Sequence, residues 1–216
     1  MCGMPPAASR PFVLASASPR RRELLGAVGL IFTVAPADLD EVAIGDGMPP
    51  DQAALAVASA KAEAIARAGD TVLAADTVVV LDGRALGKPA SRSEAVRMLE
   101  QLRDRSHDVV TAVTLRAPGV ARSALHRSAV RMRAYDRAEV ETYAATGAGL
   151  DKAGGYGIQD ENFRPVEAIE GCWCNVMGLP LWSAVRLLER VGCTARRRPD
   201  QTFPRCASCP LAAESA

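Results

Sequence analysis

A single carboxylate lies in the middle of the most strongly apolar segment of the chain. Residues 71–81 read Thr-Val-Leu-Ala-Ala-Asp-Thr-Val-Val-Val-Leu, with Asp76 at the centre and Thr77 after it. Burying a carboxylate is costly unless it is paired with a cation or holds a metal. A carboxylate at the point where a strand opens into a cleft binds a divalent ion or activates water. Asp76 is therefore the first candidate catalytic residue, and the alternative is a structural hydrogen bond.

A possible anion site lies at the start of the first predicted helix. Residues 16–21 read Ser-Ala-Ser-Pro-Arg-Arg and follow the apolar stretch 11–15. Free N–H groups and the positive end of the dipole at a helix N-terminus bind anions. Ser16, Arg20 and Arg21 add a hydroxyl and two guanidinium forks, which suit phosphate oxygens. The alternative is an ordinary capped helix with solvated arginines.

An acidic loop and the lysines are the next candidates. Residues 38–41 read Asp-Leu-Asp-Glu, and one of these carboxylates could join Asp76 around magnesium, unless the loop is simply solvated. Among 26 basic residues the only lysines are Lys61, Lys88 and Lys152. Lysine carries a compact ammonium on a flexible stem, unlike the planar fork of arginine. Lys88 follows the Asp76 strand closely, so it could reach the same phosphates, as could Lys61, although no P-loop pattern is present.

The segment 152–159, Lys-Ala-Gly-Gly-Tyr-Gly-Ile-Gln, is the candidate binding site for a flat ligand. Its glycines let the backbone approach closely. The Gln159 amide both donates and accepts hydrogen bonds, which matches the edge of a nucleobase. His107 and His126 lie in strand-like segments without a Ser or Cys partner, so we interpret both as structural.

The cysteines allow two interpretations. Cys206 and Cys209 have the C-x-x-C spacing of half a zinc site, and Cys172 and Cys174 could supply further thiolates. No second C-x-x-C exists and neither histidine lies close by in the sequence. We therefore expect reduced, unconnected thiols and keep the zinc site as the alternative.

Hydrophobic patterning indicates the elements that position these residues. Strands alternate with helices and one hairpin is centred on Pro118-Gly119, which predicts an α/β domain with a mixed sheet. The predicted strands cover residues 11–15, 31–35, 71–81, 107–115, 122–133 and 166–169. The predicted helices cover residues 19–29, 51–68, 91–102, 136–147 and 181–191.

The composition excludes several classes of protein. Hydrophobic residues make up 49% of the 216 residues and charged residues 24%, which is typical of a globular chain. The net charge of +1 gives no reason to expect binding to nucleic acid or to anionic membranes. We find neither an apolar run long enough to span a membrane nor an apolar signal core at the N-terminus, and expect a cytoplasmic protein.

Taken in order along the chain, these segments resemble the Maf family of nucleoside triphosphate pyrophosphatases. The resemblance covers residues 11–192, leaving residues 1–10 as an N-terminal extension and residues 193–216 as a C-terminal tail that we expect to be poorly ordered. Eight motifs carry it: L-A-S-A-S-P-R-R (14–21), D-L-D-E (38–41), Lys61, A-A-D-T-V-V (74–79), L-G-K-P (86–89), H-x-V-x-T (107–111), K-A-G-G-Y-G-I-Q (152–159) and G-x-x-x-N-V-x-G-L-P (171–180).

The resemblance implies a Maf/inosine-triphosphatase-like fold, in which two lobes around a long mixed β-sheet flank the active-site cleft. It implies hydrolysis of a nucleoside triphosphate between the α and β phosphates, with a divalent cation, Mg²⁺ or Mn²⁺, as cofactor. The implied roles are a catalytic carboxylate that also binds metal (Asp76), a further metal ligand (Glu41), residues of substrate choice (Arg20, Thr77, Gln159) and phosphate-side residues (Ser16, Arg21, Lys61, Lys88).

The segment 152–159 is similar to that of the family branch acting on dTTP and UTP, including modified pyrimidine nucleotides. This implies a house-cleaning enzyme with a nucleoside triphosphate as its partner. The resemblance also raises the expectation of a homodimer and, separately, of a link to cell-division arrest. Asp160 follows Gln159 where the family usually has glycine. Two alternatives remain: a non-enzymatic division regulator that binds nucleotide, and an inosine/xanthosine triphosphatase of related fold.

Overall fold

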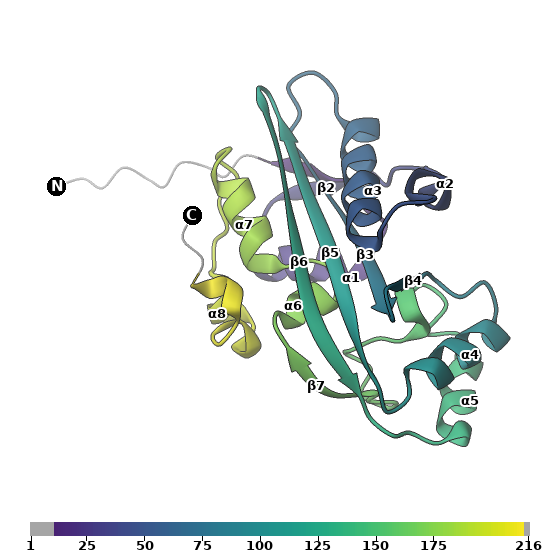
Figure 1. Cartoon of the computed structure of the whole chain (residues 1–216). Coiled ribbons are helices and arrows are strands. Elements are labelled where there is room, and N and C mark those ends of the chain that lie inside the picture. Colours follow the sequence, from purple (N-terminus) through teal and green to yellow (C-terminus); the bar gives the residue numbers. More distant parts are fainter. Residues whose placement is uncertain (1–10, 214–216) are drawn as a thin grey trace.

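A mixed sheet of seven strands forms the framework of the computed structural model, which describes residues 11–213 (Figure 1). The strands are β1 (Phe12–Leu14), β2 (Phe32–Val34), β3 (Val72–Leu81), β4 (Arg84–Leu86), β5 (Ser106–Ala117), β6 (Val120–Met132) and β7 (Val166–Glu170). The helices are α1 (Pro19–Ala27), α2 (Glu41–Gly45), α3 (Pro50–Ile65), α4 (Arg92–Leu102), α5 (Arg137–Ala145), α6 (Trp173–Val176), α7 (Leu181–Glu189) and α8 (Pro199–Thr202), with single 3₁₀ turns η1 (Ala153–Gly155), η2 (Pro204–Cys206) and η3 (Pro210–Ala212).

The apolar strand that carries Asp76 lies at the centre of the sheet. The strand order is β2-β1-β3-β5-β6-β7, and β4 pairs with β3 beyond this path. β1 runs parallel to both β2 and β3, whereas the β3–β5, β5–β6 and β6–β7 pairs are antiparallel. Residues of α3 and α1 cover opposite faces of β3, which explains its nearly continuous run of Val, Leu and Ala. The predicted α/β class with a mixed sheet is confirmed.

Local signals in the sequence set most element boundaries. β5 and β6 form the predicted hairpin, and Gly119 in its turn has a φ of 72°, where glycine has no steric penalty. Ser91 accepts a hydrogen bond from the Glu94 amide at the start of α4, as the capping box predicts. Asp136 and Glu139 form a complete capping box at the start of α5. The element boundaries agree with the sequence prediction to within a few residues.

Two hydrophobic clusters lie at opposite ends of the long strands and define the two lobes. The first cluster includes Leu24, Val113 and Trp182, and joins α1 and α7 to the sheet. The second includes Leu99, Tyr135 and others from α4, α5 and the far end of the hairpin. Figure 1 shows α2 and α3 on one side of the long strands and α6, α7 and α8 on the other. The predicted two-lobed arrangement is present.

The C-terminal tail differs from the sequence prediction. Residues 193–213 were expected to be poorly ordered, but they form α8, η2 and η3 and pack against α7. Leu211 is buried, Trp182 donates its indole N–H to the Cys206 carbonyl at 3.1 Å, and Arg186 donates to the Leu211 carbonyl at 2.6 Å. The prediction was wrong for these residues because it relied on the Arg- and Pro-rich composition. The apolar residues of the tail have no helical spacing, so their burial left no periodic signal.

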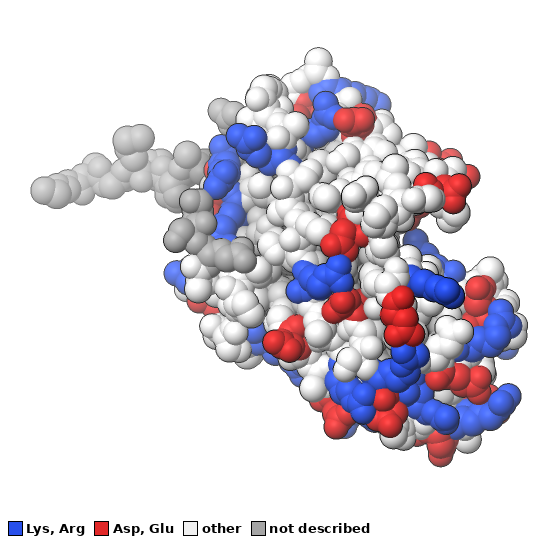
Figure 2. Space-filling model, in the orientation of Figure 1, with Lys and Arg blue, Asp and Glu red and all other residues white. Residues whose placement is uncertain are grey.

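The predicted N-terminal extension, residues 1–10, lies outside the described residues. No helix within residues 11–213 has the length and apolar character needed to cross a membrane. On the face drawn in Figure 2, lysines and arginines alternate with aspartates and glutamates over the lower half of the molecule, in keeping with the net charge of +1.

Candidate active site

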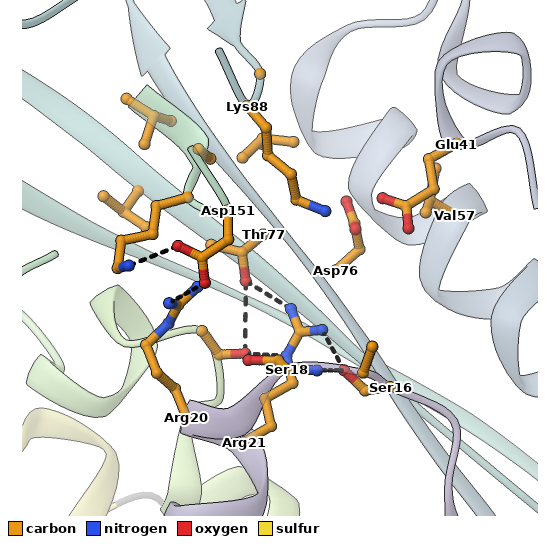
Figure 3. Close-up of a pocket in the computed structure, with 18 of the residues that line it drawn as sticks. Ser16, Ser18, Arg20, Arg21, Glu41, Val57, Asp76, Thr77, Lys88 and Asp151 are labelled. Atoms are coloured by element: carbon orange, nitrogen blue, oxygen red, sulfur yellow. Dashed lines mark hydrogen bonds and ion pairs between the residues drawn. The ribbon is translucent and has the colours of Figure 1, made fainter. Parts of the chain in front are cut away.

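A cleft of about 750 Å³ opens between the two lobes, beside the middle of β3 (Figure 3). Such a volume lies within the usual range of small-molecule sites. α1, α2 and α3 contribute one wall, and the loops that carry Lys88 and Asp151 contribute the other. All nine residues singled out from the sequence line this cleft: Ser16, Arg20, Arg21, Glu41, Lys61, Asp76, Thr77, Lys88 and Gln159.

Asp76 is buried and paired with a buried lysine. Its side chain projects from β3 toward α3, where the Lys61 ammonium lies 2.8 Å from Oδ1. Lys61 falls on the buried stripe of α3 together with Val57 and Ala58, because residues three and four apart share one face of a helix. Asp76 is 8% exposed and Lys61 7% exposed, so the pair satisfies two charges that would otherwise be buried alone.

Glu41 supplies a second carboxylate to the same ammonium. Its Oε1 lies 2.9 Å from the Lys61 Nζ. The acidic loop brings it there because Asp40 caps α2 by accepting a hydrogen bond from the Ala43 amide at 3.0 Å. Partial burial raises the pKa of Glu41, but the hydrogen bond and charge of Lys61 outweigh this and hold the pKa below its ordinary value, with help from Lys88.

Arg21 is a buried cation held by three acceptors. Its Nε donates to the Gly178 carbonyl at 2.7 Å, one terminal nitrogen donates to Ser16 Oγ at 2.9 Å and the other to Thr77 Oγ1 at 3.1 Å. Burial lowers the pKa of Arg21, although the charge of Asp76 opposes the shift. A guanidinium has five N–H groups, so each terminal nitrogen keeps one N–H for a ligand in the cleft.

Thr77 projects from the opposite face of β3 to Asp76, as the alternation of a strand requires. Its hydroxyl contacts Arg21 and lies 3.0 Å from the Thr111 hydroxyl. Thr111 in turn donates to the Asn175 carbonyl at 2.9 Å. β3 thus places a carboxylate on one face and the support for a guanidinium on the other.

Arg20, on α1, pairs with an acidic residue of the facing wall. Its guanidinium is 3.1 Å from Asp151, which also pairs with Lys152 at 2.5 Å. Burial raises the pKa of Asp151, but the hydrogen bond and charge of Lys152 and the charge of Arg20 leave it below its ordinary value. Sequence reasoning missed Asp151; its position directly before the glycine-rich segment, beside one of three lysines, was the signal available.

Lys88 and Gln159 are exposed residues of the site, and both line the cleft. Figure 3 shows the Lys88 ammonium extending toward Asp76. Gln159 follows η1, whose backbone lies close to β3: a Cβ at Gly154, where φ is 70°, would come within 3.1 Å of Val79 Cγ2. The glycine-rich segment therefore approaches the strand more closely than larger residues would permit.

His107 is structural, as predicted. Its Nε2 lies 2.7 Å from the Tyr156 hydroxyl in the second hydrophobic cluster. Burial lowers the pKa of His107 to about 4, so the ring is neutral near pH 7. Two backbone carbonyls that hold the site, those of Gly178 and Asn175, were also missed, because a carbonyl leaves no residue-type signal in a sequence.

Comparisons with known proteins identify the family of the chain. A family model described as Maf-like protein matches residues 11–191. A dTTP/UTP pyrophosphatase of Thermomicrobium roseum is 49% identical over 204 residues, which cover 93% of each chain. A dTTP/UTP pyrophosphatase of Moorella thermoacetica is 49% identical over 185 residues, covering 83% of this chain and 94% of the relative. The Staphylococcus aureus Ham1 protein structure is 17% identical, with a TM-score of 0.41 over 73% of this chain and 80% of that chain. The chain belongs to the Maf family.

Proposed function

We propose that the protein is a nucleoside triphosphate pyrophosphatase that hydrolyses dTTP and UTP to the monophosphate and pyrophosphate. The observation that carries this proposal is the Asp76–Lys61–Glu41 cluster, which lies in one cleft with Arg21 and Lys88. Its curated relatives in Thermomicrobium and Moorella are named for this activity. Nucleoside triphosphates are soluble metabolites, so we also propose a cytoplasmic enzyme.

The charge of the cleft suits a triphosphate. Near neutral pH a nucleoside triphosphate carries roughly four negative charges, and attack by water adds charge at the α phosphorus. Lys88 is exposed and reaches into the cleft, and Arg21 keeps an N–H on each terminal nitrogen. Fixed donors aimed at developing charge are a large source of rate enhancement, because they need no reorganisation during the reaction.

The donor set also fits a divalent cation. Magnesium takes one or two carboxylates and completes its shell with water and substrate phosphate. Asp76 and Glu41 already share one cation, the Lys61 ammonium, at 2.8 and 2.9 Å, so both carboxylates face a common point. We propose that they hold Mg²⁺ or Mn²⁺ when substrate enters. The cation would offset phosphate charge and polarise the bond under attack.

Asp76 is the proposed general base. Lys61 engages its Oδ1, which leaves Oδ2 to accept a proton from the attacking water. The water oxygen bonds to the α phosphorus, the bond to the bridging oxygen breaks, and pyrophosphate departs. Arg21 and Ser16 lie at the α1 end of the cleft, and Gln159, which also lines the cleft, would contact the base.

The test is release of pyrophosphate from a panel of pyrimidine and purine triphosphates with Mg²⁺ or Mn²⁺. We expect dTTP and UTP to be the best substrates. Asp76→Asn should lower turnover by roughly 10²–10⁴-fold, which is the contribution of a general base. The matched control is Asp82→Asn, in the exposed turn after the same strand, which should leave turnover unchanged. Equal turnover of Asp76→Asn and wild type would refute the assignment; absence of pyrophosphate with every triphosphate would support the nucleotide-binding regulator instead.

A further inference from the structure

Four cysteines far apart in the sequence meet beside α6. Cys172 and Cys174 come from the start of α6, and Cys206 and Cys209 come from the C-terminal tail. All four are buried, and none forms a disulfide. We call them the thiol cluster. The thiols are free, as expected, and the folded tail brings its C-x-x-C pair beside the Cys172-x-Cys174 pair.

One pair of sulfurs in the thiol cluster is in direct contact. Cys174 Sγ lies 3.4 Å from Cys206 Sγ. The Cys172 thiol interacts with the thiols of both Cys174 and Cys209. The two pairs therefore meet at one short contact and interact through a second pair of thiols, as two ligand pairs facing one ion would.

We propose that the thiol cluster is a structural zinc site that fastens the C-terminal tail to the catalytic domain. Four thiolates are the ligand set of closed, tetrahedral structural zinc sites. Binding of Zn²⁺ would displace the four thiol protons to solvent and leave four Zn–S bonds. The site is separate from the cleft and does not depend on the proposed function.

The separation of the Cys174 and Cys206 sulfurs favours a metal over a disulfide. In a tetrahedral site with Zn–S bonds of about 2.3 Å, neighbouring sulfurs are about 3.8 Å apart, whereas a disulfide bond is about 2.05 Å long. The 3.4 Å separation of Cys174 and Cys206 is closer to the first value. As they lie, the side chains of residues 11–213 form no group of three or more His, Cys, Asp or Glu that could hold a metal ion, so the four sulfurs must rearrange when zinc binds. Shifts of a few tenths of an ångström at this contact would bring it to the tetrahedral spacing.

Backbone donors around the thiol cluster suit thiolate ligands. The Asn175 amide donates to Cys172 Sγ at 3.4 Å, and the Leu211 amide donates to Cys209. Hydrogen bonds to ligating sulfur are the usual outer-shell support of a metal site. They orient one cysteine from each pair.

Cations beside the thiol cluster would offset the net negative charge of a zinc ion with four thiolates. Arg205, next to Cys206, stacks over Trp173 at 5.5 Å from the ring centre. Arg198 and Arg186 stack over Trp182 at 5.3 and 5.5 Å. Trp182 itself donates to the Cys206 carbonyl, so these arginines border the same segment.

The C-terminal tail depends on contacts with the rest of the chain for its structure. Its helical segments are three or four residues long, and segments of that length have no stability of their own. A metal that joins residues 172–174 to residues 206–209 would also brace α6 and the turn after it, whose Gly178 carbonyl holds Arg21. The zinc site would thus support one wall of the cleft from behind.

The test measures metal in the full-length protein after dialysis. We expect about one zinc per chain. The double variant Cys206→Ser/Cys209→Ser should lose it, and trypsin should then cleave faster at Arg196, Arg197 and Arg205. Two controls should retain the zinc: Cys193→Ser, a buried cysteine outside the thiol cluster, and Asp76→Asn, which removes the carboxylate of the cleft.

A second measurement does not depend on how the variants fold. Wild-type protein stripped of zinc and loaded with Co²⁺ should show sulfur-to-cobalt charge transfer and the visible bands of tetrahedral cobalt. Wild-type protein without zinc, with every thiol reactive after unfolding, would overturn the proposal. So would an intact mass lower by the hydrogens of one or two disulfides, iron in place of zinc, or zinc retained by Cys206→Ser/Cys209→Ser.

Discussion

Lys61 holds two carboxylates together, and its removal tests the electrostatics of the site directly. Lys61→Met keeps the length and the buried stem of the side chain but deletes the ammonium. The side chains of Lys61 and Asp76 are 8% and 11% exposed, so Asp76 would remain as a buried charge without its partner. Breaking a buried ion pair in this way costs about 3–5 kcal/mol. Because Asp76 borders a cleft that admits water, we expect a value near the lower end, about 3 kcal/mol.

Glu41 contributes little to that figure. Its side chain is 38% exposed, and a partly solvated pair contributes less than about 1 kcal/mol. The loss should therefore come almost entirely from Asp76. In the Asp76→Asn background the carboxylate charge is absent, so adding Lys61→Met should lower the free energy of unfolding by less than about 1 kcal/mol.

The assay is urea unfolding at pH 7, without added metal, of four proteins: wild type, Lys61→Met, Asp76→Asn and the variant that carries both substitutions. Lys88→Met is the matched control: an exposed lysine of the same cleft, it should change the free energy of unfolding by less than about 0.5 kcal/mol while slowing turnover. If Lys61→Met costs the same in both backgrounds to within about 0.5 kcal/mol, the two residues are not coupled and the reasoning is refuted.

Two further predictions concern His107, which contacts Tyr156, and Arg21 in the cleft. The pKa of His107 is lowered by burial to about 4, so between pH 6.5 and 4 the unfolded chain binds a proton that the folded chain does not, and wild type should lose up to about 3 kcal/mol of stability as pH falls through that window. His107→Gln, which can still bond Tyr156, should show a smaller loss in urea unfolding at pH 7 and pH 4.5; an identical loss would assign the acid sensitivity elsewhere. Arg21→Lys cannot reach three acceptors with one ammonium, so unfolding should become easier by roughly 2–4 kcal/mol, with slower turnover. Wild-type stability and turnover in that variant would show that the fork is dispensable.

The sequence predicts the catalytic cleft well for a physical reason. A charge inside an apolar strand needs a partner, and Asp76 marks the strand that must face one. The buried stripe of α3 brings Lys61 to the strand. The β3–β4 hairpin folds the chain back along the strand and places Lys88 just beyond it. Local patterns of this kind suffice wherever the partner lies on an adjacent element.

The contacts that the sequence did not predict are those between segments far apart in the chain. Asp151 pairs with Arg20 across 131 positions, and Gly178 holds Arg21 through a carbonyl that any residue would supply. The thiol cluster is the plainest case, because the two cysteine pairs are separated by 32 positions and by the whole of α7. The spacing within each pair was visible, but their meeting depends on how α7 packs on the sheet and returns the tail beside α6. That packing comes from many small apolar contacts, none of which has a spacing that a single sequence reveals.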